Sequence, residues 1–171
     1  GRRHHLKMRG KTSHFFSKTL DIVPGLWYTL IIQEIKEIKP MVIRYADIHD
    51  FSYIADNVKK RHMDYNTVED VRVDIEMRRL IVAVEEGKII GSVAIVYKAH
   101  RGYTAIMRMC VYAEGRGVAS ALIDYILSLN LGALGATPWN DNPAMIHIFE
   151  KRGFVYQYTF KKNYCFYEKN A

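Results

Sequence analysis

Two glycines, Gly115 and Gly117, separate a strand-like segment from a helix-like segment. Residues 107–111 alternate between two kinds of side chain, which predicts a strand with two different faces. From Val118 apolar residues recur at helical spacing, to about Leu129. The glycines permit a tight turn, and the turn leaves free backbone N–H groups at the start of the helix. Such a helix start favours an anion, for example a pyrophosphate.

Known phosphate-binding motifs match this stretch only in part. No Gly-Lys-Ser/Thr follows the glycines, so the stretch is not a Walker phosphate loop. Ser120 stands at the third glycine of a G-x-G-x-x-G dinucleotide fingerprint. A tight strand-to-helix turn that binds nothing therefore stays open as an alternative.

The composition indicates a globular protein. With 171 residues, 49% hydrophobic and 25% charged, the chain should form one domain with a substantial core. No apolar run approaches the ~20 residues needed to span a bilayer, and no signal-type segment is present, so no membrane contact is expected. Cys110 and Cys165 lack metal-ligand spacing, which favours buried free thiols, no metal and a cytoplasmic location.

Positive charge is concentrated at the N-terminus. Residues 1–40 contain eight Lys or Arg and three Asp or Glu, a net charge of +5 out of +7 for the chain. A basic arm can be attracted to nucleic acid, but a solvated tail is the more common outcome. Within this extension, residues 26–38 show helical apolar spacing that ends before Pro40, with a strand at Trp27–Gln33 as the competitor. An apolar face there needs the main domain or a second copy of the chain, so a homodimer stays open.

From Met41 the segments alternate between strand and helix signals. We predict a strand at 41–46, then a helix that is capped by Asp47 and runs through Asn57 or beyond, then a helix at 68–79 capped by Asn66 or Thr67. The first of these helices has Ile48, Phe51, Ile54 and Ala55 on one apolar face. The remaining predicted elements are a hairpin at 80–97, a strand at 103–112, the helix 118–129, a strand at 131–137, a helix at 143–152 and closing strands at 154–160 and 164–168. The order βααβββαβαββ predicts an α/β fold with a mixed sheet and flanking helices, preceded by the basic extension.

Two motifs in this order resemble the GNAT superfamily of N-acetyltransferases over residues 41–171. The family's pyrophosphate turn, Gln/Arg-x-x-Gly-x-Gly/Ala, is matched by Glu114–Ala119. Its Asn-x-x-Ala-x-x-Leu/Phe-Tyr-x-Lys/Arg-x-Gly-Phe motif is matched by Asn142–Phe154. The resemblance implies a domain at 41–171 that binds acetyl-CoA as co-substrate, with residues 1–40 as an extension without a counterpart.

The family match also implies a set of cofactor-binding residues. The backbone near Met109–Val111 would hold the pantetheine arm and polarise the thioester carbonyl, and the N–H groups of Gly115–Ser120 would hold the pyrophosphate. Asn142 would bond to the pantetheine. The implied residues are Met109, Cys110, Val111, Gly115, Arg116, Gly117, Val118, Ala119, Ser120, Asn142 and Phe149.

Several positions depart from the family pattern. Glu114 replaces the usual Gln or Arg beside the proposed pyrophosphate, so its carboxylate should point away or pair with Arg116. Phe149 stands where many members have a tyrosine that protonates the leaving thiolate, and a phenyl ring cannot do this. Met145 fills a slot usually given to a small residue.

No catalytic acid or base is assigned. The strand 103–112 contains no carboxylate, and Glu85 and Glu86 belong to the hairpin, where solvated charge is the favoured interpretation. His147 is expected on the outer face of its helix. Tyr156 and Tyr158 have hydroxyls, but strand aromatics favour a core or wall role.

Two functions are consistent with these residues. The leading one is transfer of an acetyl group from acetyl-CoA to a primary amine of an unidentified acceptor, by direct attack on the thioester. The alternative is a catalytically weak acyl-CoA-binding or regulatory module that contacts nucleic acid through its basic arm.

Overall fold

The computed structural model describes residues 40–61, 67–99, 102–160 and 162–171. The helix predicted at 26–38 and the basic arm lie outside the described residues. None of the helices in the described ranges is long and apolar enough to cross a membrane.

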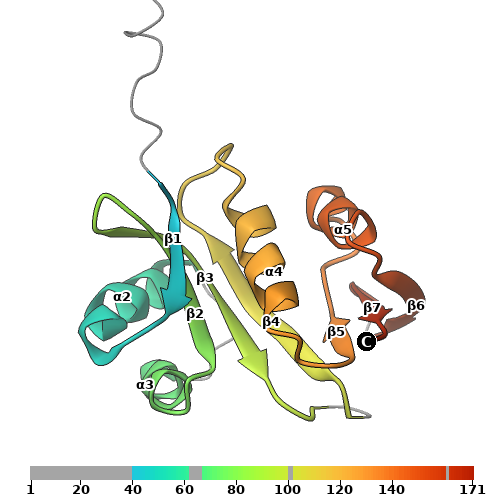
Figure 1. Cartoon of the computed structure of the whole chain (residues 1–171), viewed down its shortest axis with the longest axis horizontal. Helices are drawn as coiled ribbons and strands as arrows, with labels where there is room; N and C mark the ends of the chain where they lie inside the picture. Colours follow the sequence, from blue (N-terminus) through green and yellow to red (C-terminus); the bar gives the residue numbers. More distant parts are fainter. Residues whose placement is uncertain (1–39, 62–66, 100–101, 161) are drawn as a thin grey trace, which may run out of the picture. The chain divides into compact units, whose positions relative to one another are not determined.

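The observed elements follow the predicted order and confirm the fold class. They are β1 (Val42–Tyr45), a 3-10 turn η1 (Ile48–Asp50), α2 (Phe51–Arg61), α3 (Val68–Glu76), β2 (Leu80–Glu85), β3 (Lys88–Val96), β4 (Thr104–Val111), α4 (Val118–Ser128), β5 (Leu134–Ala136), α5 (Pro143–Glu150), β6 (Val155–Phe160) and β7 (Tyr164–Lys169). The strands form one sheet in the order β1-β2-β3-β4-β5-β7-β6. Only β4 and β5 pair in parallel, and the other neighbours are antiparallel (Figure 1).

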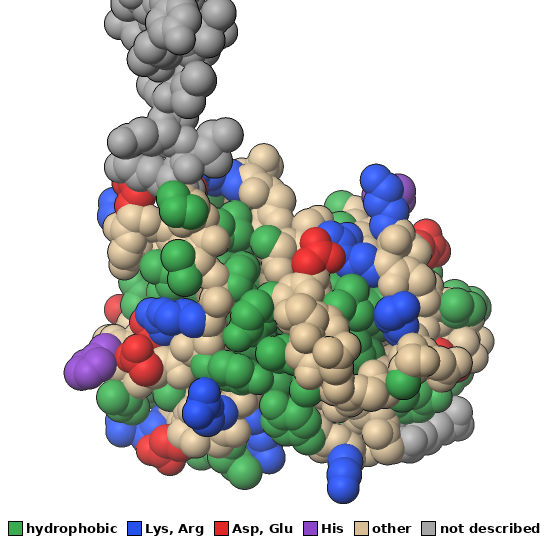
Figure 2. Space-filling view, viewed as in Figure 1, with side chains coloured by type: hydrophobic (Ala, Val, Ile, Leu, Met, Phe, Trp, Pro, Cys, Tyr) green, Lys and Arg blue, Asp and Glu red, His purple; other side chains and the backbone are tan. Residues whose placement is uncertain are grey.

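Strand β2 separates two hydrophobic cores by simple alternation. Ile81 and Ala83 pack in a cluster with α4 and α5, whereas Leu80 and Val82 pack in a second cluster with α2 and α3. Strands β2 and β3 are therefore covered on both faces, as expected for strands that are apolar on both sides. Figure 2 shows hydrophobic side chains gathered across the middle of the viewed face, with charged side chains mainly around them.

The predicted caps are present, while some element ends differ. Asp47 and Thr67 each form a capping box, as their spacing indicates. The helix after Asp47 begins as the 3-10 turn η1, and Ile48 is 48% exposed there, so its predicted place on the buried face is wrong. Helix α3 ends at Glu76, three residues earlier than predicted, because the backbone turns at Arg78 with a positive φ of 50° before entering β2.

Candidate active site

The strands β4 and β5 separate after a short paired region. Their pairs run from Thr104 opposite Leu134 to Ile106 opposite Ala136. Beyond that point β4 continues to Val111, whereas the chain after β5 turns away and Trp139 bridges to Tyr164. Figure 1 shows the two strands diverging below α4 and α5. On the side of β4 where β5 pairs only as far as Ile106, the following residues Met107 to Met109 line a cavity instead.

A bulge in β4 changes the predicted alternation. Ala94 lies opposite Met107 and Ser92 lies opposite Cys110, so β4 has one more residue than β3 in this interval. Arg108 has a φ of +52°, which places the bulge at this residue. The regular alternation predicted across 107–111 is therefore wrong at this point, because an extra residue shifts the following side chains to the other face.

The turn after β4 has the backbone expected of an anion site. Gly115 and Gly117 have φ values of +71° and +70°, angles that side chains resist. Gly117 is the N-cap of α4, and it provides no side-chain hydrogen bond to the first turn. In contrast, Thr67 and Asn142 cap α3 and α5 with their side chains. The first N–H groups of α4 thus stay available to a ligand.

Arg116 makes an ion pair that the sequence did not indicate. Its Nη2 lies 2.6 Å from Oε1 of Glu85, whose side chain is 10% exposed. The interpretation of Glu85 as a solvated turn charge is therefore wrong, because Glu85 is the last residue of β2 and pairs with the glycine turn. Glu114 is exposed, and the described ion pair of Arg116 is with Glu85 rather than with Glu114.

A small cavity of about 160 Å³ lies where the strands separate. It is lined by Ile106, Met107, Arg108, Met109, Thr137, Pro138, Trp139, Asn142, Met145, Phe149 and Tyr164. Three of the predicted site residues, Met109, Asn142 and Phe149, meet there. Asn142 also accepts a hydrogen bond from the Met145 N–H at 3.1 Å, so the same side chain caps α5 and borders the cavity.

Phe149 and Tyr164 present opposite chemistry to this small cavity. Phe149 is 3% exposed and its ring packs edge-on against Phe154 at 5.0 Å between centroids. Tyr164 and Thr137 bring hydroxyl groups that the sequence analysis did not select. No local spacing marks them, because they come from β7 and from the segment after β5 and meet only in the folded chain.

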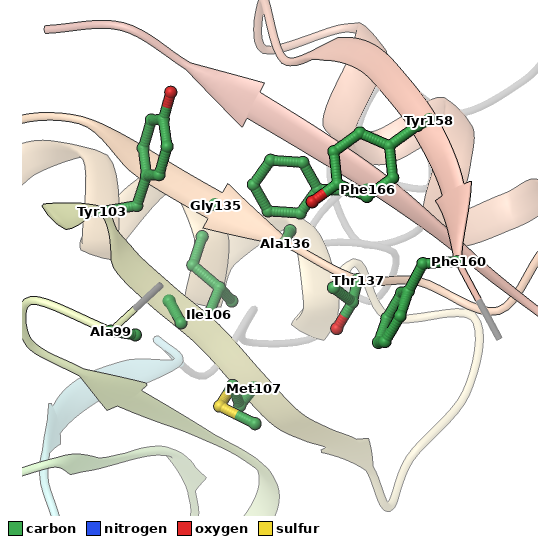
Figure 3. A pocket seen from close by; sticks show the side chains of 11 residues that line it. Ala99, Tyr103, Ile106, Met107, Gly135, Ala136, Thr137, Tyr158, Phe160 and Phe166 are labelled. Carbon is green, nitrogen blue, oxygen red and sulfur yellow. The ribbon is translucent and has the colours of Figure 1, made fainter. Parts of the chain in front are cut away.

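A larger cavity adjoins the small one, and we call it the aromatic cavity. Its volume is about 410 Å³. Its lining is Ala99, Tyr103, Ala105, Ile106, Met107, Gly135, Ala136, Thr137, Tyr158, Phe160 and Phe166 (Figure 3). Ile106, Met107 and Thr137 line both cavities, so the two meet where β4 and β5 separate.

The helices beside the cleft are tied together by Arg152. Its guanidinium contacts both carboxylate oxygens of Asp124 at 2.6 and 2.7 Å and donates to the Ser120 carbonyl at 3.3 Å. The hydrogen bond from Arg152 lowers the pKa of Asp124 below its usual value. This link holds the end of α5 against the first half of α4.

The described lining of both cavities contains no Asp, Glu or His side chain. Nor do the described residues include a group of three or more His, Cys, Asp or Glu side chains placed to hold a metal ion. His147 is exposed, as predicted. Of the predicted thiols, Cys165 is buried and Cys110 is partly exposed.

Comparison with known proteins agrees with this geometry. Residues 76–156 match a family model described as an acetyltransferase (GNAT) domain. No curated protein sequence matches the chain.

Solved acetyltransferase structures share the fold. A GNAT-family acetyltransferase from Bacillus cereus ATCC 10987 superposes with a TM-score of 0.68 at 18% identity, covering 77% of this chain and 97% of its own. A ribosomal-protein-alanine N-acetyltransferase from Brucella melitensis gives 0.65 at 17% identity, covering 76% and 99%. Spermidine N-acetyltransferase from Vibrio cholerae, in complex with CoA and spermine, gives 0.61 at 17% identity, covering 76% and 95%.

The predicted resemblance is therefore confirmed. The described part of the chain has the fold of solved GNAT-family acetyltransferases. Within it, residues 76–156 match the acetyltransferase (GNAT) domain, which gives this region its class.

Proposed function

We propose that the protein transfers an acetyl group from acetyl-CoA to a primary amine by direct attack on the thioester. The observation that supports this most is the start of α4, which has no side-chain cap, next to the part of β4 that extends beyond its pairing with β5. One feature suits a pyrophosphate and the other suits an extended pantetheine arm, and they follow each other in the chain. A solved relative, the putative acetyltransferase yncA from Salmonella typhimurium, contains acetyl-CoA.

The N–H groups from Gly115 to Ser120 would bind the pyrophosphate, since they gather at the positive end of the α4 dipole. Arg116 pairs with Glu85, and this ion pair steadies the turn. The backbone from Met109 to Val111 extends beyond the pairing of β4 with β5, and on that side it would bond to the pantetheine amides in the way that a neighbouring strand would. Asn142, at the border of the small cavity, would contact the same arm.

The chemistry then needs few side chains. The neutral amine nitrogen attacks the thioester carbonyl carbon, the C–S bond breaks, and the sulfur leaves with the electron pair. One amine proton is lost to solvent and the thiolate takes up a proton. A backbone N–H at the β4 bulge would polarise the carbonyl as negative charge develops on its oxygen. Tyr164 and Thr137 line the small cavity, and their hydroxyls would be candidate donors of the proton to the sulfur.

Calorimetry with CoA and a thiol-release assay with acetyl-CoA and primary amines test this proposal. We expect saturable CoA binding and amine-dependent thiol release. CoA binding without transfer to any amine would favour the alternative of a binding or regulatory module, which the family match does not favour. Absence of CoA binding would refute both. Contact of the N-terminal arm with nucleic acid and assembly into a homodimer stay as separate proposals, tested by salt-dependent retention and by the solution mass of the full chain.

A further inference from the structure

The aromatic cavity is open next to the place where the amine would react. Three of its walls come from β4, from β5 and from the hairpin of β6 and β7. Figure 3 shows the rings of Tyr158, Phe160 and Phe166 on one side and Ile106 and Met107 on the other. A volume of about 410 Å³ lies within the range of small-molecule sites. Neither the glycine turn nor the part of β4 beyond Met107 lines it.

Small residues create this space. Gly135 lies under the Phe166 ring, and a Cβ there would come 3.1 Å from Cε2 of that ring. Because Gly135 has no side chain, the Phe166 ring can lie across β5, next to the open volume beside Ala136 (Figure 3). Any β-carbon at Gly135 would displace the ring that forms the floor of the cavity.

The chemistry of the lining excludes a strongly charged guest. Its polar side-chain groups are the hydroxyls of Tyr103, Thr137 and Tyr158, and none of the lining residues is acidic. The Tyr103 hydroxyl donates to Glu168 at 2.6 Å and points away from the cavity (Figure 3). A second ammonium group placed inside would lose its hydration without gaining a carboxylate, and such burial is costly. An aromatic ring has no charge to dehydrate, and inside the cavity it would contact several aromatic rings of the lining.

We infer that the acceptor is a primary amine whose neighbouring substituent is apolar and aromatic in size, such as an arylalkylamine, and that the enzyme discriminates against polyamines. This inference rests on the proposed acetyl transfer and adds the substrate class. Ile106, Met107 and Thr137 border both cavities. An acceptor whose ring occupies the aromatic cavity would therefore direct its amine toward the small cavity, where the thioester would lie.

Two tyrosines on β6 provide a matched pair of variants. The β6–β7 pairing shifts between Tyr156 and Tyr158, so the two rings have different partners. Tyr158 packs on Phe166 at 5.2 Å and lines the cavity, whereas Tyr156 packs on Tyr167 at 5.7 Å and does not line it. They are 36% and 48% exposed, so their substitution should perturb folding to a similar, small degree.

The experiment compares 2-phenylethylamine, a peptide amide beginning with Phe, and spermidine as acceptors for the full chain. We expect kcat/KM for an aromatic amine to exceed that for spermidine by about tenfold or more, the worth of burying part of a ring. Tyr158→Ala should raise KM for the aromatic amine by about tenfold with unchanged KM for acetyl-CoA, while Tyr156→Ala should change neither beyond about twofold. Comparison of the peptide amide with 2-phenylethylamine shows whether the aromatic amine is the N-terminus of a peptide or a small molecule.

Calorimetry with CoA and with 2-phenylethylamine distinguishes failure of the substrate class from failure of the proposed function. If CoA binds but the aromatic amine neither binds nor outperforms spermidine, the substrate class is overturned and acetyl transfer stands. The substrate class is also overturned if hexanoyl-CoA outperforms acetyl-CoA and Tyr158→Ala removes that preference, because the cavity then holds an acyl chain; the activity would then be transfer of a longer acyl group rather than of acetyl. If neither CoA binding nor thiol release occurs, the proposed function and this inference both fall.

Discussion

Arg108 donates from Nη1 to Oδ2 of Asp74 over 2.7 Å, which joins the β4 bulge to helix α3. Both side chains are largely buried, at 19% and 5% exposed. Arg108 interrupts the regular pairing of β4 with β3, and its side chain is also the one that anchors β4 to helix α3. Since the backbone after the bulge borders the small cavity, this ion pair positions the strand that would hold the thioester.

Removing one partner of this pair should be costly. We expect Asp74→Ala to lower the free energy of unfolding by about 3–5 kcal/mol, because it leaves a buried guanidinium without its carboxylate. The double variant Asp74→Ala with Arg108→Met should recover most of this loss. Chemical denaturation measures both. Glu69→Ala, which breaks the exposed pair with Arg72, is the control and should cost less than about 1 kcal/mol. A double variant as unstable as the single one would show that the pair does not balance buried charge.

Gly117 should matter for CoA as well as for the backbone. Gly117→Val places a β-branched residue at a φ of +70° and should weaken CoA binding by about 1–3 kcal/mol through misplaced N–H donors. Gly132 has a φ of +75° in the loop after α4, so Gly132→Val gives comparable strain away from the turn. We expect both variants to melt at lower temperature and only Gly117→Val to lose CoA affinity by calorimetry. Equal affinities in the two would refute the placement of the pyrophosphate.

Phe149 and Phe154 allow a direct test of the missing hydroxyl. The two rings pack together and are both buried, but only Phe149 lines the small cavity. Phe149→Tyr can place its hydroxyl in that cavity, so we expect little change in melting and a higher rate of thiol release. Phe154→Tyr should bury a hydroxyl without benefit and cost about 1–3 kcal/mol.

General acid catalysis typically contributes ~10²–10⁴-fold, so a gain in the lower part of that range would be measurable. A fall in turnover of about a hundredfold in Phe149→Tyr, with melting and CoA affinity unchanged, would show instead that the phenyl ring itself is functional.

The pair of Asp124 and Arg152 should give a small, pH-dependent stability. The pKa of Asp124 is lowered in the folded protein by the hydrogen bond from Arg152, so the pair stabilises the fold above the usual carboxyl range. The contribution is lost as the pH falls below about 4, through the folded-state pKa. Asp124→Asn should cost less than about 1 kcal/mol at pH 7, since the carboxylate is 60% exposed.

Thermal melting between pH 3 and pH 7 measures this difference, which should shrink toward the acid end. Asp141→Asn, on an exposed loop, is the control and should match the wild type throughout. A difference between Asp124→Asn and wild type that persists undiminished in acid would mean that the ion pair is not its source.

The sequence by itself determined the order of elements, the two helix caps at Asp47 and Thr67, and the glycine turn before α4. These features depend on neighbours within a few residues, and the side-chain types there report the local backbone directly. The strand–turn–helix at Gly115 and Gly117 could therefore be placed without knowledge of the rest of the chain.

Tertiary structure decided which side chains meet. The bulges at Arg108 and between Tyr156 and Tyr158 turn side chains to faces that alternation does not predict. A bulge arises from how two strands pair, and no single strand encodes its partner's register. Tyr164 joins Met109 and Phe149 at the small cavity only because β5 parts from β4 and lets the chain fold back beside it. The shape of both cavities is set by this separation, a property of the whole sheet rather than of any one segment.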